Sequence, residues 1–398
     1  MKFQDLMLKF PHFSEKIFPR LDNESLFKCR EVTRLWQNII DGRNYPWLCI
    51  VNIPAILTQR NLYLHLAAET GQVQAFKTAF NQEVDLNIKN ELGETSFHHA
   101  CKNGRSSIAQ LLMNDVNGEF SHGIDINAKT KDHMTGFHWA CMRGHADVVK
   151  IFLENAVALS IDLNMKENVG LSGFHIACGK GHSEVVRILM ESALNLSIDL
   201  HNKTILGISA FQTACVKGRS EVVKIFMEKA PILNIDLNAK TSNGRTAFYR
   251  ACFKGHADVV KIFMENAIAL SIDLNAKDDN GKSGFHWACE RGHVDVVKIF
   301  MENAIALSID LDAKDEHGKS GFCWACERGH SDVVKMFMAN ALILSIDLNS
   351  KSSGITAFQA ACFMGHSEVI KIFKENATAL GLDITGENFI TLECVIDN

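Results

Sequence analysis

One apolar pattern recurs at a fixed interval along most of the chain. Phenylalanines follow one another every 37 residues, at Phe137, Phe174, Phe211, Phe248, Phe285 and Phe322. A constant spacing of 37 residues over so many periods does not arise by chance. The pattern therefore predicts a row of near-identical units, each of which buries its apolar face against the next.

The stretch 273–307 shows what each unit is expected to form. A polar turn ends at Gly281, and a short helix is predicted from about Ser283 to Arg291. Gly292 follows it at the place where a left-handed C-terminal cap is needed. The buried side of this helix should carry Phe285, Ala288 and Cys289.

A second, longer helix is predicted from about Val294 through Met301, with Ala306 as its furthest end. Asp295 lies at its N-terminal end, where a negative charge is favoured by the helix dipole. Its apolar residues share one stripe, formed by Val296, Val297, Phe300, Met301 and Ala304.

The order turn, helix, Gly, helix resembles the ankyrin repeat. Residues 281–297 read GKSGFHWACERGHVDVV, which is similar to the signature G-x-T-P-L-H-x-A-A-x-x-G-H-x-x-V-V. The resemblance implies an all-α ankyrin-repeat solenoid of about nine helix pairs. Two departures are the long period, with added residues around 305–308 that lengthen the second helix or its loop, and the absence of the helix-starting Pro, replaced by Gly136, Gly173, Ala210 and Ala247.

Residues 1–50 follow a different pattern, predicting a small module of three short helices. Its apolar residues follow the order Phe10-Pro11-x5-Ile17-Phe18-x2-Leu21-x4-Leu26-x5-Val32-x3-Trp36-x10-Trp47. This order resembles the F-box, which implies docking to a Skp-type adaptor and, through it, to a cullin scaffold. The contact set carried over from that resemblance is Phe10, Pro11, Ile17, Leu21, Leu26, Val32 and Trp36. The alternative is that this module only covers the open end of the solenoid, and both roles are compatible.

These patterns divide the chain into four parts. Residues 1–50 form the F-box-like module, 51–60 a linker, 61–380 the ankyrin repeats, and 381–398 a truncated C-terminal capping repeat.

Charge and hydropathy exclude some partners. The net charge is -5, and Lys and Arg are scattered at fixed repeat positions, so neither nucleic acid nor a membrane surface is expected as a partner. No apolar run approaches the roughly 20 residues that cross a bilayer, and residues 1–9 do not resemble a signal peptide. We expect an intracellular protein of the cytoplasm or nucleus, monomeric apart from its complex.

The cysteines and histidines predict structure and no catalysis. Of the 12 cysteines, eight occupy one repeat position, as expected of small buried thiols. Cys323 and Cys326 form a C-x-x-C, but Cys323 takes the place of a first-helix histidine and Cys326 is the repeated thiol. We therefore predict no metal site, no cofactor and no catalytic residue.

Specificity should lie at the turn and first-helix positions that vary while the frame stays constant. Trp and Arg are enriched at binding hot spots, and exposed apolar turn residues are hard to explain by packing. The candidates for binding a target protein on the concave side are Trp139, Arg143, Ile205, Leu206, Arg250, Trp287, Arg291, Trp324 and Arg328. For the tryptophans, packing between repeats is the alternative.

These inferences favour a non-catalytic substrate receptor of an SCF-type cullin ubiquitin ligase, in which the F-box-like module holds the adaptor and the ankyrin groove binds the target. The alternative is an ankyrin scaffold or sequestering protein with no role in ubiquitin transfer.

Overall fold

The computed structural model describes residues 60–74, 76, 85–114 and 124–385. Within these residues the chain forms 17 helices and one two-stranded antiparallel hairpin, β1 (Lys351–Ser352) and β2 (Ile355–Thr356). The predicted all-α fold is confirmed. The F-box-like module, all seven of its adaptor-contact residues and most of the C-terminal cap lie outside the described residues.

Each repeat contributes a first and a second helix. The first helices are α6 (Arg60–Thr70), α8 (Ser96–Lys102), α10 (Gly136–Arg143), α12 (Gly173–Lys180), α14 (Ala210–Val216), α16 (Ala247–Lys254), α18 (Gly284–Glu290), α20 (Gly321–Glu327) and α22 (Ala357–Phe363). The second helices are α9 (Ser106–Asn114), α11 (Ala146–Asn155), α13 (Ser183–Leu196), α15 (Ser220–Leu233), α17 (Ala257–Asn266), α19 (Val294–Asn303), α21 (Ser331–Leu344) and α23 (Ser367–Leu380).

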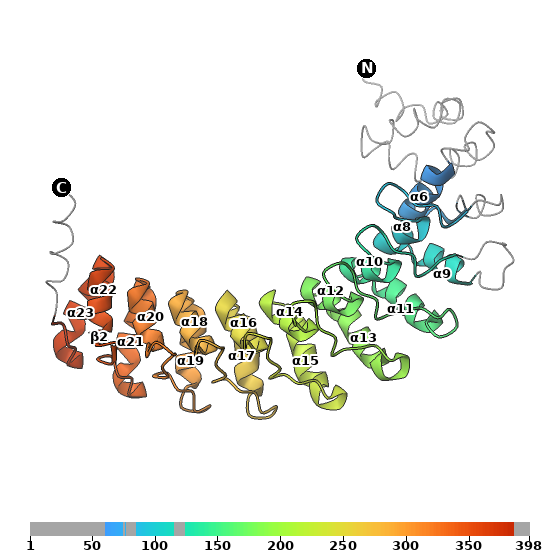
Figure 1. Cartoon of the computed structure of the whole chain (residues 1–398). Coiled ribbons are helices and arrows are strands. Elements are labelled where there is room, and N and C mark those ends of the chain that lie inside the picture. Colours follow the sequence, from blue (N-terminus) through green and yellow to red (C-terminus); the bar gives the residue numbers. More distant parts are fainter. Residues whose placement is uncertain (1–59, 75, 77–84, 115–123, 386–398) are drawn as a thin grey trace, which may run out of the picture. The chain divides into compact units, whose positions relative to one another are not determined.

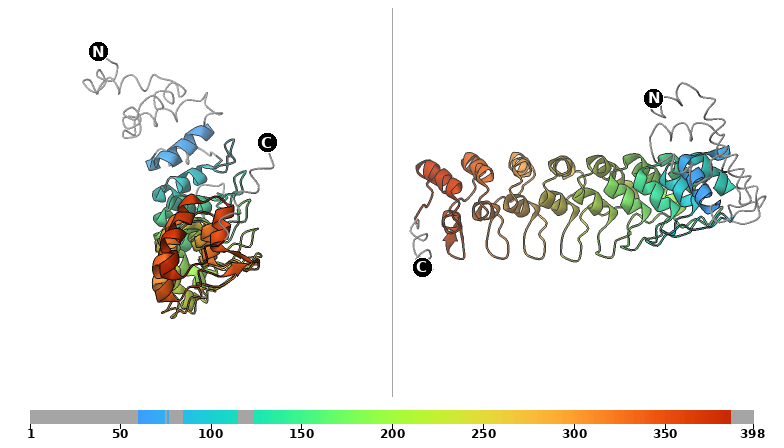
Figure 2. Two further views of the ribbon diagram at one scale, coloured as in Figure 1. Left: turned by 90° about the vertical axis from the view of Figure 1, so that its left-hand side faces the viewer. Right: turned by 90° about the horizontal axis from the view of Figure 1, so that it is seen from above.

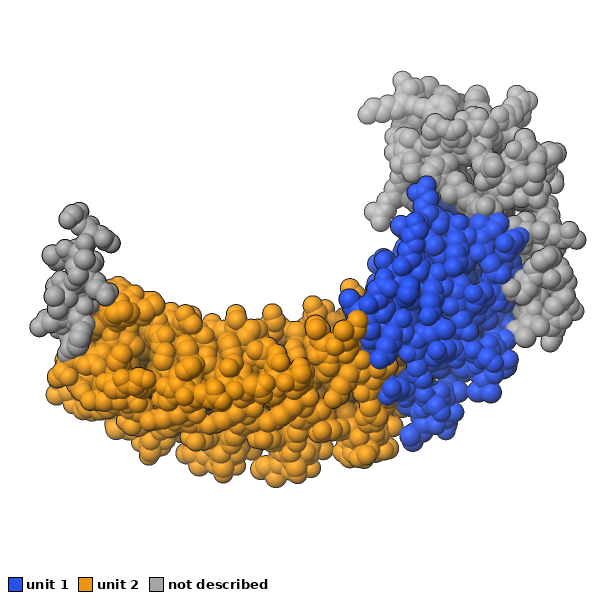
Figure 3. All heavy atoms as spheres, in the orientation of Figure 1, with its two compact units in different colours: residues 1–177, 191–199 blue, residues 178–190, 200–398 orange. Residues whose placement is uncertain are grey.

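The chain divides into two compact units, coloured separately in Figure 3. Unit 1 holds residues 1–177 and 191–199, and unit 2 holds residues 178–190 and 200–398. Within unit 2 the first helices α14 to α22 follow one another in one row, and the second helices α15 to α23 in another (Figures 1 and 2). In unit 1, α6, α8 and α10 pack in the same sequential way.

A ladder of phenylalanine rings fills the space between the two rows of unit 2. Phe285 on α18 lies 5.0 Å, centroid to centroid, from Phe300 of its own repeat and 5.9 Å from Phe337 of the next. Phe322 repeats the arrangement with Phe337 at 5.1 Å. The first-helix phenylalanines are therefore buried, and each ties its own repeat to the following one.

The predicted helix ends are confirmed to within a residue or two in the type repeat. Its first helix has Ser283 and Arg291 as flanking caps, and Gly292 has φ 68°, the left-handed conformation that glycine adopts without strain. The second helix has Asp295 in its first turn.

The repeated thiols are buried, as predicted, because first helices approach one another closely there. A Cβ placed on Gly284 would lie 2.9 Å from the Sγ atom of Cys252 in the preceding repeat, and Gly321 stands in the same relation to Cys289. At these glycines a proline would meet the thiol of the preceding repeat, whereas Ala210 and Ala247 carry a Cβ at the equivalent position.

The added residues of the long period take part in a link of hydrogen bonds between neighbouring repeats. They end the second-helix segment at a residue with positive φ, such as Ser271 at 50° or Ser308 at 51°. Asn238 Nδ2 donates to the Ser271 carbonyl at 2.9 Å, while its Oδ1 accepts the Asp273 amide at 2.9 Å. The prediction that these residues lengthen helix or loop is confirmed in both forms: α17 and α19 have 10 residues followed by turns, whereas α15 and α21 have 14.

Candidate functional site

The first helices of unit 2 and the turns before them carry most of the residues predicted to bind a target. The buried frame of each repeat is fixed by the phenylalanine, alanine and cysteine positions. The surface positions, which in the repeat 278–291 are Asp278, Lys282, Trp287, Glu290 and Arg291, hold other residues in the repeat 241–254. We call the face formed by these varied positions in residues 241–328 the recognition strip.

Two repeats of the strip neutralise their own charges. In the first, Lys282 Nζ lies 2.6 Å from Glu290 Oε2, and the indole N–H of Trp287 donates to Asp278 Oδ2 at 3.3 Å. Both side chains of the ion pair are nearly buried, so the charges compensate each other where water is largely excluded.

The next repeat has the same arrangement. Lys319 Nζ lies 2.5 Å from Glu327 Oε2, and Trp324 Nε1 donates to Asp315 Oδ2 at 2.9 Å. We call residues 278–291 and 315–328 the closed repeats.

Aromatic and cationic groups join the closed repeats to each other. Lys282 Nζ stands 3.5 Å from the centroid of the Trp324 ring and 4.6 Å from that of Trp287. Arg328 reaches back to Glu290 at 3.1 Å. Trp324 is only 7% exposed, so much of its surface is used in packing between repeats, whereas Trp287 is half-buried.

Between α16 and α18 the strip is more aromatic. Phe253 lies 5.1 Å from the Trp287 ring, and the guanidinium of the exposed Arg291 stands 3.9 Å above Phe253. The structure thus brings three predicted target-binding residues, Arg250, Trp287 and Arg291, into two neighbouring repeats.

The repeat 241–254 differs from the closed repeats. Arg245 and Arg250 take the positions of Lys282 and Trp287, and both are half-buried. Burial and the nearby charge of Arg245 lower the pKa of Arg250. We call residues 241–254 the open repeat.

Two apolar residues mark the turn of the repeat before it. Ile205 and Leu206, predicted from sequence, are 74% and 73% exposed. Nothing in the packing of the frame requires large aliphatic groups at this tip.

Unit 1 carries a charge-reversed version of the closed arrangement. Glu94 lies where the closed repeats have lysine, and Lys102 pairs with it at 2.9 Å. Hydrogen bonds from His99 and Lys102 hold the pKa of Glu94 well below its usual range, against the opposing effect of burial. The predicted residue Trp139 is half-buried with Lys102 Nζ 4.2 Å above its ring, and Arg143 is exposed.

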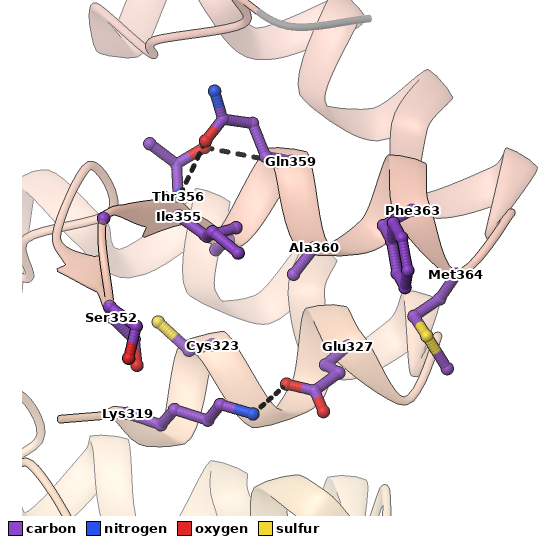
Figure 4. A pocket seen from close by; sticks show the side chains of 13 residues that line it. Lys319, Cys323, Glu327, Ser352, Ile355, Thr356, Gln359, Ala360, Phe363 and Met364 are labelled. Carbon is purple, nitrogen blue, oxygen red and sulfur yellow. Dashed lines mark hydrogen bonds and ion pairs between the residues drawn. The ribbon is translucent and has the colours of Figure 1, made fainter. Parts of the chain in front are cut away.

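A pocket of about 520 Å³ lies at the C-terminal end of the first-helix row. Figure 4 shows that α22 contributes Ala360 and Phe363, that Met364 follows directly after this helix, and that α20 contributes Cys323 and Glu327. Phe363 is 68% exposed. Sequence reasoning did not select this pocket, although an aromatic and a methionine replacing the Glu and Arg of the closed repeats were a visible signal.

A second surface that sequence reasoning missed runs along the ends of the second helices. Aliphatic residues repeat there at the added positions, each at least 75% exposed: Ile268, Ile305 and Leu342. Their recurrence in step with the phenylalanines was the available signal.

The histidines at the two repeated positions of the described residues have structural roles. The backbone amide of Thr95 donates to Nδ1 of His98 at 3.1 Å, and His98 Nε2 bonds the Met134 carbonyl at 3.2 Å. Burial lowers the pKa of His98 to about 4, and burial also lowers the pKa of His138 and His286. The histidines after the helix-ending glycine bond a carbonyl of the preceding repeat, as His293 does with Phe253 at 3.1 Å.

Cys323 and Cys326 are both buried on α20, and burial raises the pKa of the Cys326 thiol. Across the described part of the chain, no group of three or more His, Cys, Asp or Glu side chains is placed to hold a metal ion. Nor does any helix in the described ranges have the length and apolar character needed to span a bilayer.

Stacked helix pairs with a constant frame and a varied face define a class of solenoid that presents surfaces to proteins. The family model for ankyrin repeats, built on three copies, matches overlapping windows that together run from residue 64 to residue 387. The chain belongs to the ankyrin-repeat family, whose repeats are protein-interaction modules. A search of curated proteins found no match to this chain.

Proposed function

We propose that the chain is a non-catalytic substrate receptor of an SCF-type ubiquitin ligase. The target protein binds the turns and first helices, and residues 1–50 hold a Skp-type adaptor and its cullin. Chemistry is supplied by a recruited conjugating enzyme, so this chain contributes proximity and selection.

The observation that carries target binding is the recognition strip. Its cationic and aromatic residues lie at positions that the buried frame leaves free, and residues of these types are favoured at binding hot spots. The exposed Ile205 and Leu206 extend the same face.

The adaptor role rests on the F-box-like order of residues 10–47, which precedes the family match starting at residue 64. The proposed division is the one given by the sequence: module 1–50, linker 51–60, repeats 61–380 and cap 381–398.

Co-purification with a Skp-type adaptor tests the proposal. The full chain should retain the adaptor, and the double variant Pro11→Ala/Leu26→Ala should lose it. The variant Lys261→Gln, on the exposed side of α17, serves as the control that should leave binding intact.

A wild-type chain that ignores the adaptor contradicts the ligase role. Target binding that survives deletion of residues 1–50, with no change in target abundance, would then identify a plain ankyrin interaction protein.

A further inference from the structure

The open repeat contains two arginines that nothing in the described structure neutralises. The Nε atoms of Arg245 and Arg250 are buried and make no hydrogen bond. Among the ion pairs of the described residues, neither guanidinium has a carboxylate partner. Both side chains are half-buried, and a buried N–H donor without an acceptor is costly.

Comparison with the closed repeats explains why partners are missing. The acids of the first closed repeat, Asp278 and Glu290, correspond at an interval of 37 residues to Thr241 and Phe253. Thr241 keeps the turn, because its Oγ1 accepts the Arg245 amide at 3.3 Å, but it brings no charge. The open repeat thus has an additional arginine, Arg250, in the place of Trp287 and carries neither acid.

The surroundings suit a peptide side chain better than a free ion. Tyr249 and Phe253 stack with rings 6.2 Å apart, and the Arg245 guanidinium lies 5.4 Å from the centroid of Tyr249. The Tyr249 hydroxyl is buried near Asp278, whose carboxylate already accepts the indole N–H of Trp287. The carboxylate of Asp279 lies beside the turn at Gly244, and this residue is exposed to solvent.

We propose that Arg245 and Arg250 form a binding site for an anionic side chain, a carboxylate or a phosphate group, of a bound protein segment. The inference rests on the proposed function, since it names the chemistry of the target that the recognition strip selects. Two guanidinium groups match the fork of acceptor oxygens on either group. Neighbouring aromatic rings contact the apolar part of the same segment.

The variant Thr241→Asp tests this directly because it retains both arginines. At the equivalent position, Asp278 Oδ2 accepts from the residue nine places later, Trp287. The new carboxylate therefore reaches the place of Arg250 and should occupy the site from within. Arg250→Gln removes a donor, and Lys261→Gln on α17 is the matched control for loss of one charge.

Arginine side-chain N–H resonances of the full chain are titrated with inorganic phosphate and, separately, with acetate. In the wild type and in Lys261→Gln, the Nε–H signals of Arg245 and Arg250 should shift saturably. Arg250→Gln and Thr241→Asp should weaken the apparent affinity at least tenfold. No saturable shift in the wild type, or an unchanged affinity in Thr241→Asp, overturns the proposal.

A displayed peptide library containing Asp, Glu and phosphoserine separates the two sources of the anion. Peptides selected by the wild type should carry an acidic residue at one fixed position, and selection by Thr241→Asp should lose it. Selected peptides without such a position overturn the anionic site while leaving target binding in place. The adaptor assay, which depends on residues 1–50, reports on the ligase role separately.

Discussion

The open repeat and the closed repeat that follows it share a frame and differ on their face. Phe248 and Phe285 are equally buried and contact successive second helices in the same way. On the surface, one repeat balances Lys282 with Glu290, whereas the other leaves Arg245 and Arg250 unpaired. In this solenoid, stability and recognition are therefore assigned to different positions of the same repeat.

The largest expected effect tests whether the frames are equivalent. Phe285→Ala and Phe248→Ala should each lower the free energy of unfolding by about 3–5 kcal/mol, because each leaves a cavity between two repeats. Denaturant unfolding followed by circular dichroism measures this. Costs that differ by more than about 2 kcal/mol would contradict a shared frame.

A closed repeat can be opened by removing its acid. Glu290→Gln leaves Lys282 nearly buried without its ion pair and Arg328 without its partner, and should destabilise by about 2 kcal/mol, since hydrogen bonds between charged groups contribute about 1.5–3 kcal/mol. The same variant should gain saturable phosphate binding. An unchanged midpoint of unfolding would show that the pair contributes nothing.

Acid should affect repeats that carry the capping histidine and spare the open repeat, where Tyr249 takes its place. The folded pKa of His98 is about 4, below its usual 6.5, so between these values the unfolded state binds more protons and stability falls with falling pH. From pH 7 to pH 5 this histidine should cost roughly 1–2 kcal/mol.

The pH dependence is measured by denaturant unfolding at a series of pH values. The variant His98→Gln should reduce its slope by the contribution of one histidine, because Gln212 and Gln359 occupy the same position and keep the capping bonds. A Tyr249→Gln variant, which removes no histidine, should leave the slope unchanged.

The smallest effect concerns the link between repeats. Asn238 donates and accepts across its link, but Asp312 only accepts, from the Asp347 amide, and burial raises its pKa. Asp312→Asn should stabilise by about 1 kcal/mol at neutral pH through the regained donor. The gain should shrink in acid, where protonation gives Asp312 a donor of its own; a destabilised variant would refute this account.

The sequence predicted the fold well because the frame is periodic. Phe285, Cys289 and Gly292 recur at fixed places, and each has one physical reason to be there. The site was predicted only in part, because the identity of a residue such as Arg250 or Trp324 does not show which side chains lie beside it. Trp324 packs against Lys282 one repeat away, and Arg245 lacks a partner because Thr241 and Phe253 replace the two acids.

Hydrogen exchange of the full chain with peptides selected from the displayed library tests the central claim most directly. The account predicts protection in residues 204–217, 241–254 and 278–291, on the turns and first helices. Protection confined to residues 266–272 and 303–309, around the exposed Ile268 and Ile305, would place recognition on the second-helix ends and contradict it.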